Sequence, residues 1–276
     1  MTKISVIIPT YHAALFIQKT LASVANQTKQ PSEVFIIDDG SIDETCSVVD
    51  EFSAAHPALN IRLIRESHQG PGAMRNVGIK AATSEWLAFL DSDDIWYPEK
   101  LEIITKAIAE NPACNFFCHN EQMLFADGST SVVDYSRLYS SGLSLPKQLY
   151  LHNLFSTSAV VCRRSDVLDV NGFDENLSST QDYELWLRMS LNIAPHFIHQ
   201  VLGIYAIRPG NISSTQRFKR LMNIWRVMIR HRSKAGNGLI MSFSLFRLTL
   251  LHLLGPFLSK FKKLMESLNL KNAPKS

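Results

Sequence analysis

Short apolar runs alternate with longer stretches over the first 112 residues of the chain. The runs are brief and rich in β-branched residues, which is typical of strands buried in a sheet. Pro9 follows the first run, and we expect it to end that strand. Strands that alternate with helices predict an α/β fold with a mainly parallel sheet and helices on both faces. The predicted strands are 4–8, 33–37, 61–64 and 86–90, and the predicted helices between them are 13–25, 43–55 and 70–81.

The alternation weakens after residue 112, and the pattern becomes helical from Arg217 onward. We therefore expect one domain, 1–214, with a first half to residue 112 and a second half from residue 113. A helical tail, 215–276, follows this domain. In the second half, the predicted strands are 114–125, 157–162 and 196–207, the predicted helix is 182–191, and the pattern of 137–152 is mixed.

Polar residues directly follow three of the predicted strands. Tyr11 comes after the first strand, Asp39 after the second, and the turn Asp91-Ser92-Asp93-Asp94 after the fourth. Ligands of parallel α/β sheets bind beyond the carboxyl ends of the strands. We therefore expect these side chains to meet at one edge of the sheet and to form one site.

Composition and charge indicate the compartment of the protein and the charge of a partner. Hydrophobic residues make up 46% of the chain and charged residues 19%, as in an ordinary globular protein. The four cysteines lack the spacing of a zinc site and the first residues lack a signal peptide, so we expect free thiols in the cytoplasm. Residues 217–276 hold 13 Lys/Arg and one acid, whereas the preceding residues hold 15 Lys/Arg and 24 acids. A basic tail on an acidic body favours an anionic partner.

The acidic turn after the fourth strand has two chemical interpretations. Asp91 and Asp93 are one residue apart and are suited to one hard divalent cation, Mg²⁺ or Mn²⁺, which prefers oxygen ligands and bridges carboxylates to phosphates. The alternative is a helix cap, which applies best to Asp94 because Pro98 suits the first turn of a following helix. The cap is a weak interpretation of Asp93, so the metal is favoured there.

Three further residues also have a structural and a functional interpretation. Tyr11 is either a partly buried core aromatic or a platform on which a flat base stacks. Asp39 either closes its turn with Gly40 or accepts a hydrogen bond from a base N–H. Arg75 is either a solvated surface residue or a charge partner for phosphates or for the acidic turn. The glycine motifs of nucleoside triphosphatases and dinucleotide dehydrogenases are absent, which disfavours both classes.

Four segments of the chain resemble glycosyltransferase family 2 in their order and approximate spacing. They are SVIIPTYHAALFIQKTLASVANQT, EVFIIDDGSIDET, GPGAMRNVGIKAATSEWLAFLDSDDIWYPEKLE and TQDYELWLRM, and the resemblance covers roughly residues 3–210. It implies a GT-A fold, with a Rossmann-like mixed, mainly parallel sheet, and an inverting enzyme that uses Mn²⁺ or Mg²⁺. It also implies a nucleotide-sugar donor, with a UDP-sugar favoured, and a hydroxyl of a glycan or glycolipid as acceptor, in cell-surface polysaccharide synthesis.

The resemblance assigns roles to the polar residues at the strand ends. Arg75 is implied to lie near the nucleotide, and Asp93 to be the more direct of two metal ligands. The residues implied for the nucleoside pocket are Pro9, Tyr11 and Asp39, and those implied for the DxD motif of the metal site are Asp91 and Asp93.

Two residues of the second half complete the implied site. Asp182 matches the general base of the family, with Gln181 where a glutamate is common. From the residues alone, Asp182 is either a base that reaches an acceptor hydroxyl or a first-turn acid that stabilises its helix. Arg208 replaces a histidine that lies near the metal or diphosphate in many members. A guanidinium cannot bind a metal, but it can stabilise the charge of a leaving group.

The tail has an apolar segment, 239–258, with Arg247 near its centre and Lys/Arg on both sides. Its length permits a membrane span. A central arginine costs about 2.5–3.5 kcal/mol against gains of about 0.3–0.6 kcal/mol per Leu or Phe, so the sum is not decisive. Peripheral contact with an anionic membrane, at its inner face, is favoured over packing on protein and over a span. Nucleic acid is disfavoured because no aromatic residues are interleaved for readout.

Two rival functions remain in view at this point. A sugar-nucleotide nucleotidyltransferase has a similar fold, but it usually carries a glycine-rich loop after the first strand, and this chain has none. A catalytically inactive nucleotide-sugar-binding protein is disfavoured because Asp91, Asp93 and Asp182 are all present.

Overall fold

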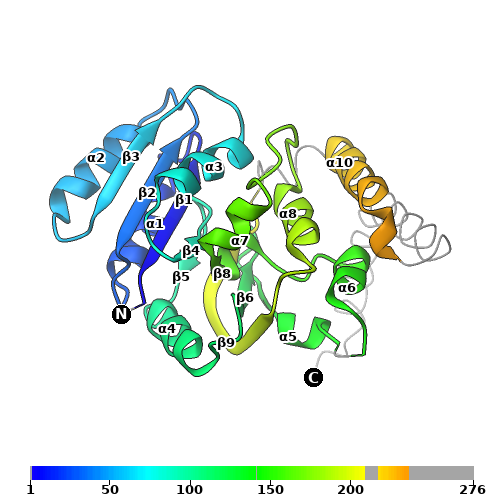
Figure 1. Ribbon diagram of the computed structural model, residues 1–276. Coiled ribbons are helices and arrows are strands. Elements are labelled where there is room, and N and C mark those ends of the chain that lie inside the picture. Colours follow the sequence, from blue (N-terminus) through cyan, green and yellow to red (C-terminus); the bar gives the residue numbers. More distant parts are fainter. Residues whose placement is uncertain (1, 141, 209–216, 236–276) are drawn as a thin grey trace, which may run out of the picture.

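The computed structural model of the chain describes residues 2–140, 142–208 and 217–235 (Figure 1). Its strands form one sheet in the order β3-β2-β1-β4-β8-β6-β9-β5, and β7 pairs with β6. The strands are β1 (Ile4–Thr10), β2 (Glu33–Asp38), β3 (Ile61–Arg65), β4 (Trp86–Phe89), β5 (Ile95–Trp96), β6 (Phe116–Leu124), β7 (Thr130–Val133), β8 (Val160–Arg163) and β9 (Pro195–Ala206). The helices are α1 (Ile17–Ala25), α2 (Thr45–Ala55), α3 (Pro71–Ala81), α4 (Lys100–Glu110), α5 (Tyr135–Leu138), α6 (Leu145–Leu151), α7 (Arg164–Asp169), α8 (Gln181–Met189) and α10 (Arg217–Arg230), with 3₁₀ turns at Thr157–Ala159 and Arg232–Ala235.

The first half of the sheet is parallel and the second half is mixed. Strand β1 pairs in parallel with β2 and β4, and β2 pairs in parallel with β3. Strand β8 runs antiparallel to both of its neighbours, β4 and β6, whereas β6 and β9 are parallel. The short strands β5 and β7 are antiparallel to β9 and β6. The predicted fold, a mixed and mainly parallel sheet, is confirmed.

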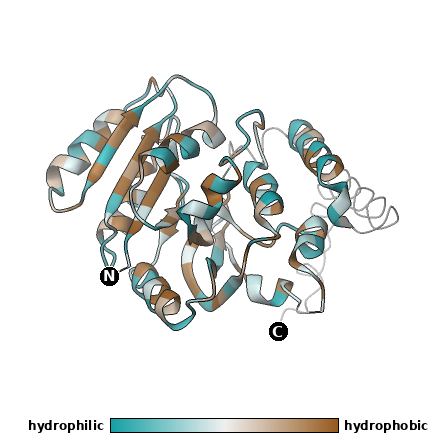
Figure 2. Cartoon of the chain, viewed as in Figure 1, coloured by the Kyte–Doolittle hydropathy of each residue, from teal (hydrophilic) through white to brown (hydrophobic). Residues whose placement is uncertain are grey.

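Helices cover both faces of the sheet, as predicted (Figure 1). Because successive side chains of a strand point to opposite faces, β1 contributes to two cores. Val6 and Ile8 belong to a core that includes residues of α1, α2 and α4, and Ile7 belongs to a core that includes residues of α3, α6, α7, α8 and α10. In Figure 2 the hydrophobic residues concentrate on the central strands, and most helices carry both hydrophobic and hydrophilic residues.

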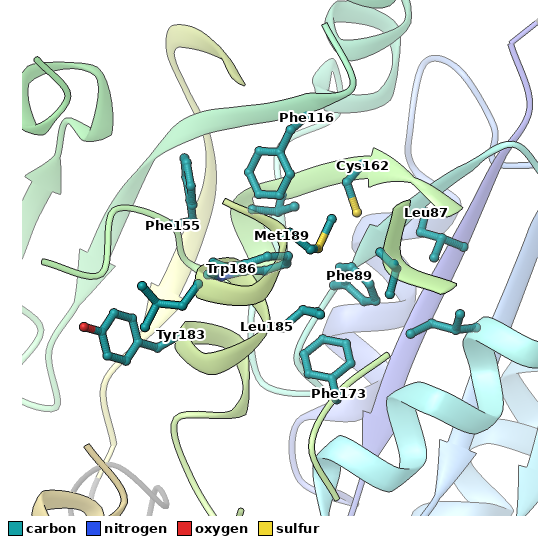
Figure 3. Packing of buried hydrophobic residues seen from close by; sticks show 14 of the residues in the cluster. Leu87, Phe89, Phe116, Phe155, Cys162, Phe173, Tyr183, Leu185, Trp186 and Met189 are labelled. Atoms are coloured by element: carbon teal, nitrogen blue, oxygen red, sulfur yellow. The ribbon is translucent and has the colours of Figure 1, made fainter. Parts of the chain in front are cut away.

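Trp186 fastens α8 to the second of these cores (Figure 3). Its buried ring lies 5.1 Å from the ring of Phe116 and 6.4 Å from the rings of Phe89, Phe155 and Phe173, measured between centroids. Aromatic pairs at such distances contribute about 0.5–1.5 kcal/mol each beyond the area they bury. The packing of Trp186 therefore fixes the position of α8, whose first turn carries Asp182.

Pro9 does not end the first strand, contrary to our expectation. Strand β1 continues through Pro9, which pairs with Ile37 of β2, to Thr10. The main-chain groups of Ile7 and Pro9 face β4, and the last bond on that side runs from Leu90 N–H to the Ile7 carbonyl. The lack of an N–H at Pro9 therefore removes no hydrogen bond of the sheet, because β4 ends at Phe89 and offers no partner at this position.

The alternative interpretation of Asp94 as a helix cap does not hold. Helix α4 begins at Lys100, and β5 lies between it and Asp94. The Asp94 carboxylate is buried and accepts hydrogen bonds from the Ser158 hydroxyl and the Ala206 backbone N–H. Asp94 thus joins the acidic turn to the 3₁₀ turn before β8 and to β9, both in the second half of the domain.

Smaller elements and the cysteines complete the comparison with the predictions. The sequence did not reveal β5, β7 or α7, and the mixed stretch 137–152 contains α5 in part and α6. All four cysteines are free, with Cys118 and Cys162 buried and the other two half-buried. The apolar segment 239–258 lies outside the described residues. Within the described ranges, no helix has the length and apolar character to cross a membrane.

Candidate active site

One cleft of ≈ 940 Å³ lies beyond the carboxyl ends of β1, β2 and β4. The second half of the domain closes it with residues before and within α8 and at the end of β9. Every residue that the sequence singled out lines this cleft: Pro9, Tyr11, Asp39, Arg75, Asp91, Asp93, Asp182 and Arg208. The predicted convergence of the strand ends is therefore confirmed, while the individual roles stay predictions.

At one end of the cleft, Asp39 organises the loop before α3. Its carboxylate accepts hydrogen bonds from the backbone N–H groups of Gln69, at 2.7 Å, and Gly70, at 2.9 Å. Gly70 has φ 95°, a conformation that favours glycine. The His68 Nδ1 atom lies 2.9 Å from the same carboxylate. The Asp39 carboxylate thus holds the loop before α3, whereas Asp38 closes the turn by accepting from the Ser41 backbone N–H.

The ring of Tyr11 stacks with two imidazoles. His12 stacks on it at a centroid distance of 4.1 Å, and His68 at 4.5 Å. Tyr11 is half exposed, so it is not a core residue. A flat aromatic surface at this end of the cleft is suited to a nucleobase, which stacks on aromatic and imidazole rings.

In the acidic turn, each residue of the DxD pair is matched with an arginine. Arg75 Nη2 lies 2.5 Å from Asp91 Oδ1, and Arg208 forms an ion pair with Asp93. Burial and the charge of Asp91 raise the pKa of Asp93, and Arg208 opposes this rise. Arg208 also lies over the ring of Phe16, 3.4 Å from its centroid. The two cations stabilise the ionised form of carboxylates that otherwise repel each other.

A buried polar network supports the acidic turn from behind. The Ser158 hydroxyl donates to Asp94 Oδ2 at 2.6 Å and accepts from the Asp91 backbone N–H at 3.1 Å. The Ser158 carbonyl accepts hydrogen bonds from Lys100 Nζ and Trp96 Nε1. Burial, together with the charges of Asp93, Asp91 and Glu121, raises the pKa of Asp94. Ser158 therefore connects the turn to a fully buried lysine.

The donor set at Asp91 and Asp93 fits a divalent cation. Within residues 2–140, 142–208 and 217–235, no cluster of three or more His, Cys, Asp or Glu side chains is arranged to hold a metal. Mg²⁺ commonly takes only one or two protein carboxylates when substrate phosphates complete its shell. The two carboxylates are thus suited to a cation that binds together with a diphosphate.

Asp182 lies at the other end of the cleft, in the first turn of α8. Asn153 Nδ2 donates a hydrogen bond to its Oδ2 at 3.1 Å. Burial raises the pKa of Asp182, while a backbone N–H and the charge of Arg75 act in the opposite direction. A carboxylate with a raised pKa binds a proton more tightly than an ordinary aspartate does, which suits a general base.

Backbone strain is concentrated around this cleft. Among the described residues, three non-glycine positions have positive φ, and His12 (47°) and Thr180 (63°) line the cleft. A β-branched residue such as Thr180 rarely adopts this conformation, which costs of order 1–3 kcal/mol. Thr180 is the residue before α8, so the strain is located where Asp182 is placed.

Sequence reasoning missed several residues of this site. Ser158 and Asn153 carry no motif, and they reach the site through contacts between segments far apart in the chain. His68 stands two residues before Gly70, and its only sequence signal was proximity to that glycine. Arg220 of α10 also lines the cleft.

Comparison with known proteins decides the family. Residues 5–166 match the sequence model of the family described as glycosyl transferase family 2. The chain belongs to this family. It is 33% identical over 190 residues to an uncharacterised glycosyltransferase of Rickettsia felis, covering 68% of this chain and 30% of that protein. The chain therefore spans less than a third of the length of that relative.

One further relative and one solved structure are informative. The Escherichia coli protein WfgD, named as a UDP-Glc:α-D-GlcNAc-diphosphoundecaprenol β-1,3-glucosyltransferase, is 29% identical over 230 residues, which cover 82% of this chain and 85% of that protein. The mannosyltransferase PcManGT of Pyrobaculum calidifontis, solved with GDP-Man and Mn²⁺, superimposes with a TM-score of 0.67 at 19% identity, covering 97% of this chain and 80% of that chain. The structural likeness supports the GT-A fold.

Proposed function

We propose that this family 2 protein is an inverting glycosyltransferase that moves a sugar from a UDP-sugar to a hydroxyl of a glycan or lipid-linked glycan. The observation that carries the proposal is the meeting of Asp182, the DxD pair and Arg75 in one cleft. The first half of the domain supplies a base-stacking surface and charged groups for a diphosphate. The second half supplies a carboxylate for the acceptor.

The relatives support the substrate classes within this proposal. The name of WfgD includes a UDP-sugar as donor and a diphosphoundecaprenol-linked sugar as acceptor. The structure of PcManGT contains a different nucleotide sugar and Mn²⁺. We place the reaction in cell-surface polysaccharide synthesis, on the cytoplasmic side of the membrane, with the basic tail in peripheral contact with that surface.

The mechanism follows from the positions of the charged side chains. Asp182 accepts the proton of the acceptor hydroxyl as its oxygen attacks the anomeric carbon from the face opposite the leaving group, so the configuration inverts. Asn153 holds one oxygen of Asp182 and orients the carboxylate. Arg75 and Arg208 stabilise the negative charge that develops on the nucleoside diphosphate.

Asp91 and Asp93 are the residues that would hold Mn²⁺ or Mg²⁺, with Asp93 as the more direct ligand. When bound, such a cation acts as a Lewis acid toward the diphosphate oxygens. The buried Nε of Arg75 has no hydrogen-bond acceptor among the described residues.

Release of nucleoside diphosphate from a panel of nucleotide sugars, in the presence of Mn²⁺, tests the proposal. We expect slow hydrolysis of a UDP-sugar by the native chain and tenfold or greater loss of UDP affinity in Asp93→Ala. Release of pyrophosphate from a sugar phosphate and a nucleoside triphosphate would instead identify a nucleotidyltransferase. If the protein bound the donor but showed no turnover with any acceptor, it would be a nucleotide-sugar-binding protein without catalytic activity, and the proposal would be overturned.

A further inference from the structure

Helix α10 has an apolar face that the protein buries and a second one that it leaves exposed. On the buried face, Ile224, Val227 and Met228 pack into the core shared with α6 and α8. On the opposite face, four large apolar side chains are 36–76% exposed. These four residues, which we call the α10 stripe, are Phe218, Met222, Trp225 and Ile229.

The spacing of the α10 stripe places it on one side of the helix. Its residues are separated by four, three and four positions, so they fall within about 60° of one another around the helical axis. A scattered set of exposed apolar residues is normal on a protein surface, but a contiguous row is a sign of an interaction surface.

The contacts of α10 with the body prevent the helix from turning to bury this row. Tyr150 donates a hydrogen bond to the Met228 carbonyl, and Asn223 donates to the hydroxyl of Ser179. At the end of the helix, His231 Nε2 lies 3.2 Å from the buried carboxylate of Glu184. The orientation of the α10 stripe toward the outside is thus fixed by the opposite face.

The charge around the α10 stripe is of one sign. Residues 217–235 contain seven Lys/Arg and no acid. Lys219 and Arg226 are exposed and lie next to the stripe on the helix. A helix with aromatic and aliphatic residues on one side and basic residues beside them binds at the interface of an anionic bilayer.

We propose that α10 lies in the headgroup region of an anionic phospholipid membrane, with the α10 stripe inserted and Lys219 and Arg226 on the lipid phosphates. This assigns the membrane contact to a specific face of a helix that is packed on the catalytic domain. The consequence for the acceptor rests on the proposed function.

Arg220 and Ile224 of α10 line the cleft that contains Asp182. The membrane surface would therefore lie about one helix diameter, roughly 10 Å, from the acceptor side of the cleft. An acceptor sugar linked to a membrane lipid would then reach Asp182 with its hydroxyl while the lipid stays in the bilayer.

Trp225 provides a direct probe of this contact. The other three tryptophans, Trp86, Trp96 and Trp186, are at most 2% exposed, so a change in quenching reports on Trp225. The full chain is mixed with vesicles of phosphatidylglycerol and phosphatidylcholine, with and without brominated acyl chains. We expect quenching by brominated lipid, protection from aqueous acrylamide, and loss of both effects in Trp225→Phe.

Paired variants separate insertion from charge and from nonspecific adhesion. Phe218→Asp with Ile229→Asp should weaken vesicle binding at least tenfold. Lys219→Glu with Arg226→Glu should weaken it by about fivefold or more per charge, and only on anionic vesicles. The matched control is Ile42→Asp, at an exposed apolar position outside α10, which should leave binding unchanged.

Three outcomes would overturn the proposal. If residues 236–276 cover the α10 stripe, Trp225 will be shielded from acrylamide without vesicles. If a second copy covers it, shielding will depend on protein concentration rather than on lipid. If the Phe218→Asp, Ile229→Asp chain still binds vesicles as the native chain does, another part of the protein makes the contact.

Hydrolysis of the donor in solution keeps this test separate from the proposed function. Vesicle binding without donor turnover would support the membrane contact of α10 and refute the proposed glycosyltransferase activity. Donor turnover that persists without any vesicle binding would refute the membrane surface alone.

Discussion

Ser158→Ala tests whether the network behind the acidic turn holds the candidate active site together. The Ser158 side chain is 1% exposed, as is Asp94, which accepts its hydrogen bond at 2.6 Å. The same hydroxyl accepts a hydrogen bond from the Asp91 backbone N–H at 3.1 Å. Alanine removes a single oxygen atom, so the substitution breaks two buried hydrogen bonds and creates almost no cavity.

The magnitude follows from the burial of both partners. A hydrogen bond to a charged acceptor contributes about 1.5–3 kcal/mol, and a buried N–H left without a partner costs about 1–3 kcal/mol. The two losses share one atom and are not additive, so we expect the free energy of unfolding to fall by about 2–5 kcal/mol. For a protein of this size, that loss lowers Tm by about 4–20 °C.

The cost should also depend on pH. The Ser158 hydroxyl lowers the pKa of Asp94, against burial and neighbouring carboxylates that raise it. The hydrogen bond therefore stabilises the ionised form, and its loss should matter more as pH rises through the pKa of Asp94 and less below it.

Thermal unfolding of Ser158→Ala across a pH series measures both effects, with UDP affinity as a measure of the site. The control is Ser47→Ala, which removes an exposed hydroxyl in α2. If Ser158→Ala unfolded within about 1 °C of the native chain at every pH, the network would not support the turn, and the reasoning would be refuted.

Three other substitutions test separate parts of the site. Asp182→Asn should abolish transfer and retain donor binding, and it should raise Tm slightly because it removes a partly buried charge. In the native chain, the transfer rate should fall as pH drops through the raised pKa of Asp182. Arg208→Gln should tighten Mn²⁺ binding about tenfold in calorimetry without donor, since it frees Asp93, yet lower turnover. Glu184→Gln should destabilise the chain by about 2–3 kcal/mol and expose α10 to proteases, because Arg188 and His231 lose a buried charge partner, whereas an unchanged digestion pattern would argue against that contact.

The sequence was sufficient to predict the part of the fold that depends on local pattern. Buried parallel strands are short apolar runs, and the chain leaves each of them at the same edge of the sheet. Tyr11, Asp39 and the acidic turn therefore had to approach one another, whatever the details of the loops between them.

The sequence was insufficient where a residue acts through a distant segment. Asp94 has the local pattern of a helix cap, but its partners are Ser158, 64 residues further along the chain, and the backbone of Ala206, 112 residues further along. Pro9 was expected to end β1 because a proline lacks an N–H, yet the end of β4 had already removed the partner that this N–H would need. Both errors concern contacts between segments that are far apart in the chain, which no local pattern specifies.

The same limit explains why the arginines were only partly understood from the sequence. Arg75 was expected to be a charge partner for phosphates or for the acidic turn, and the ion pair with Asp91 fits the second of these. Arg208 was expected near the leaving group, but it is engaged with Asp93. A diphosphate donor brings further negative charge into this cleft. Asp91 and Asp93 repel each other when no cation is beside them. The two guanidinium groups can therefore turn fully to the diphosphate only if another cation takes their place at these two carboxylates. Binding of a divalent cation and binding of the donor should therefore each strengthen the other, and by linkage the two enhancements should be equal.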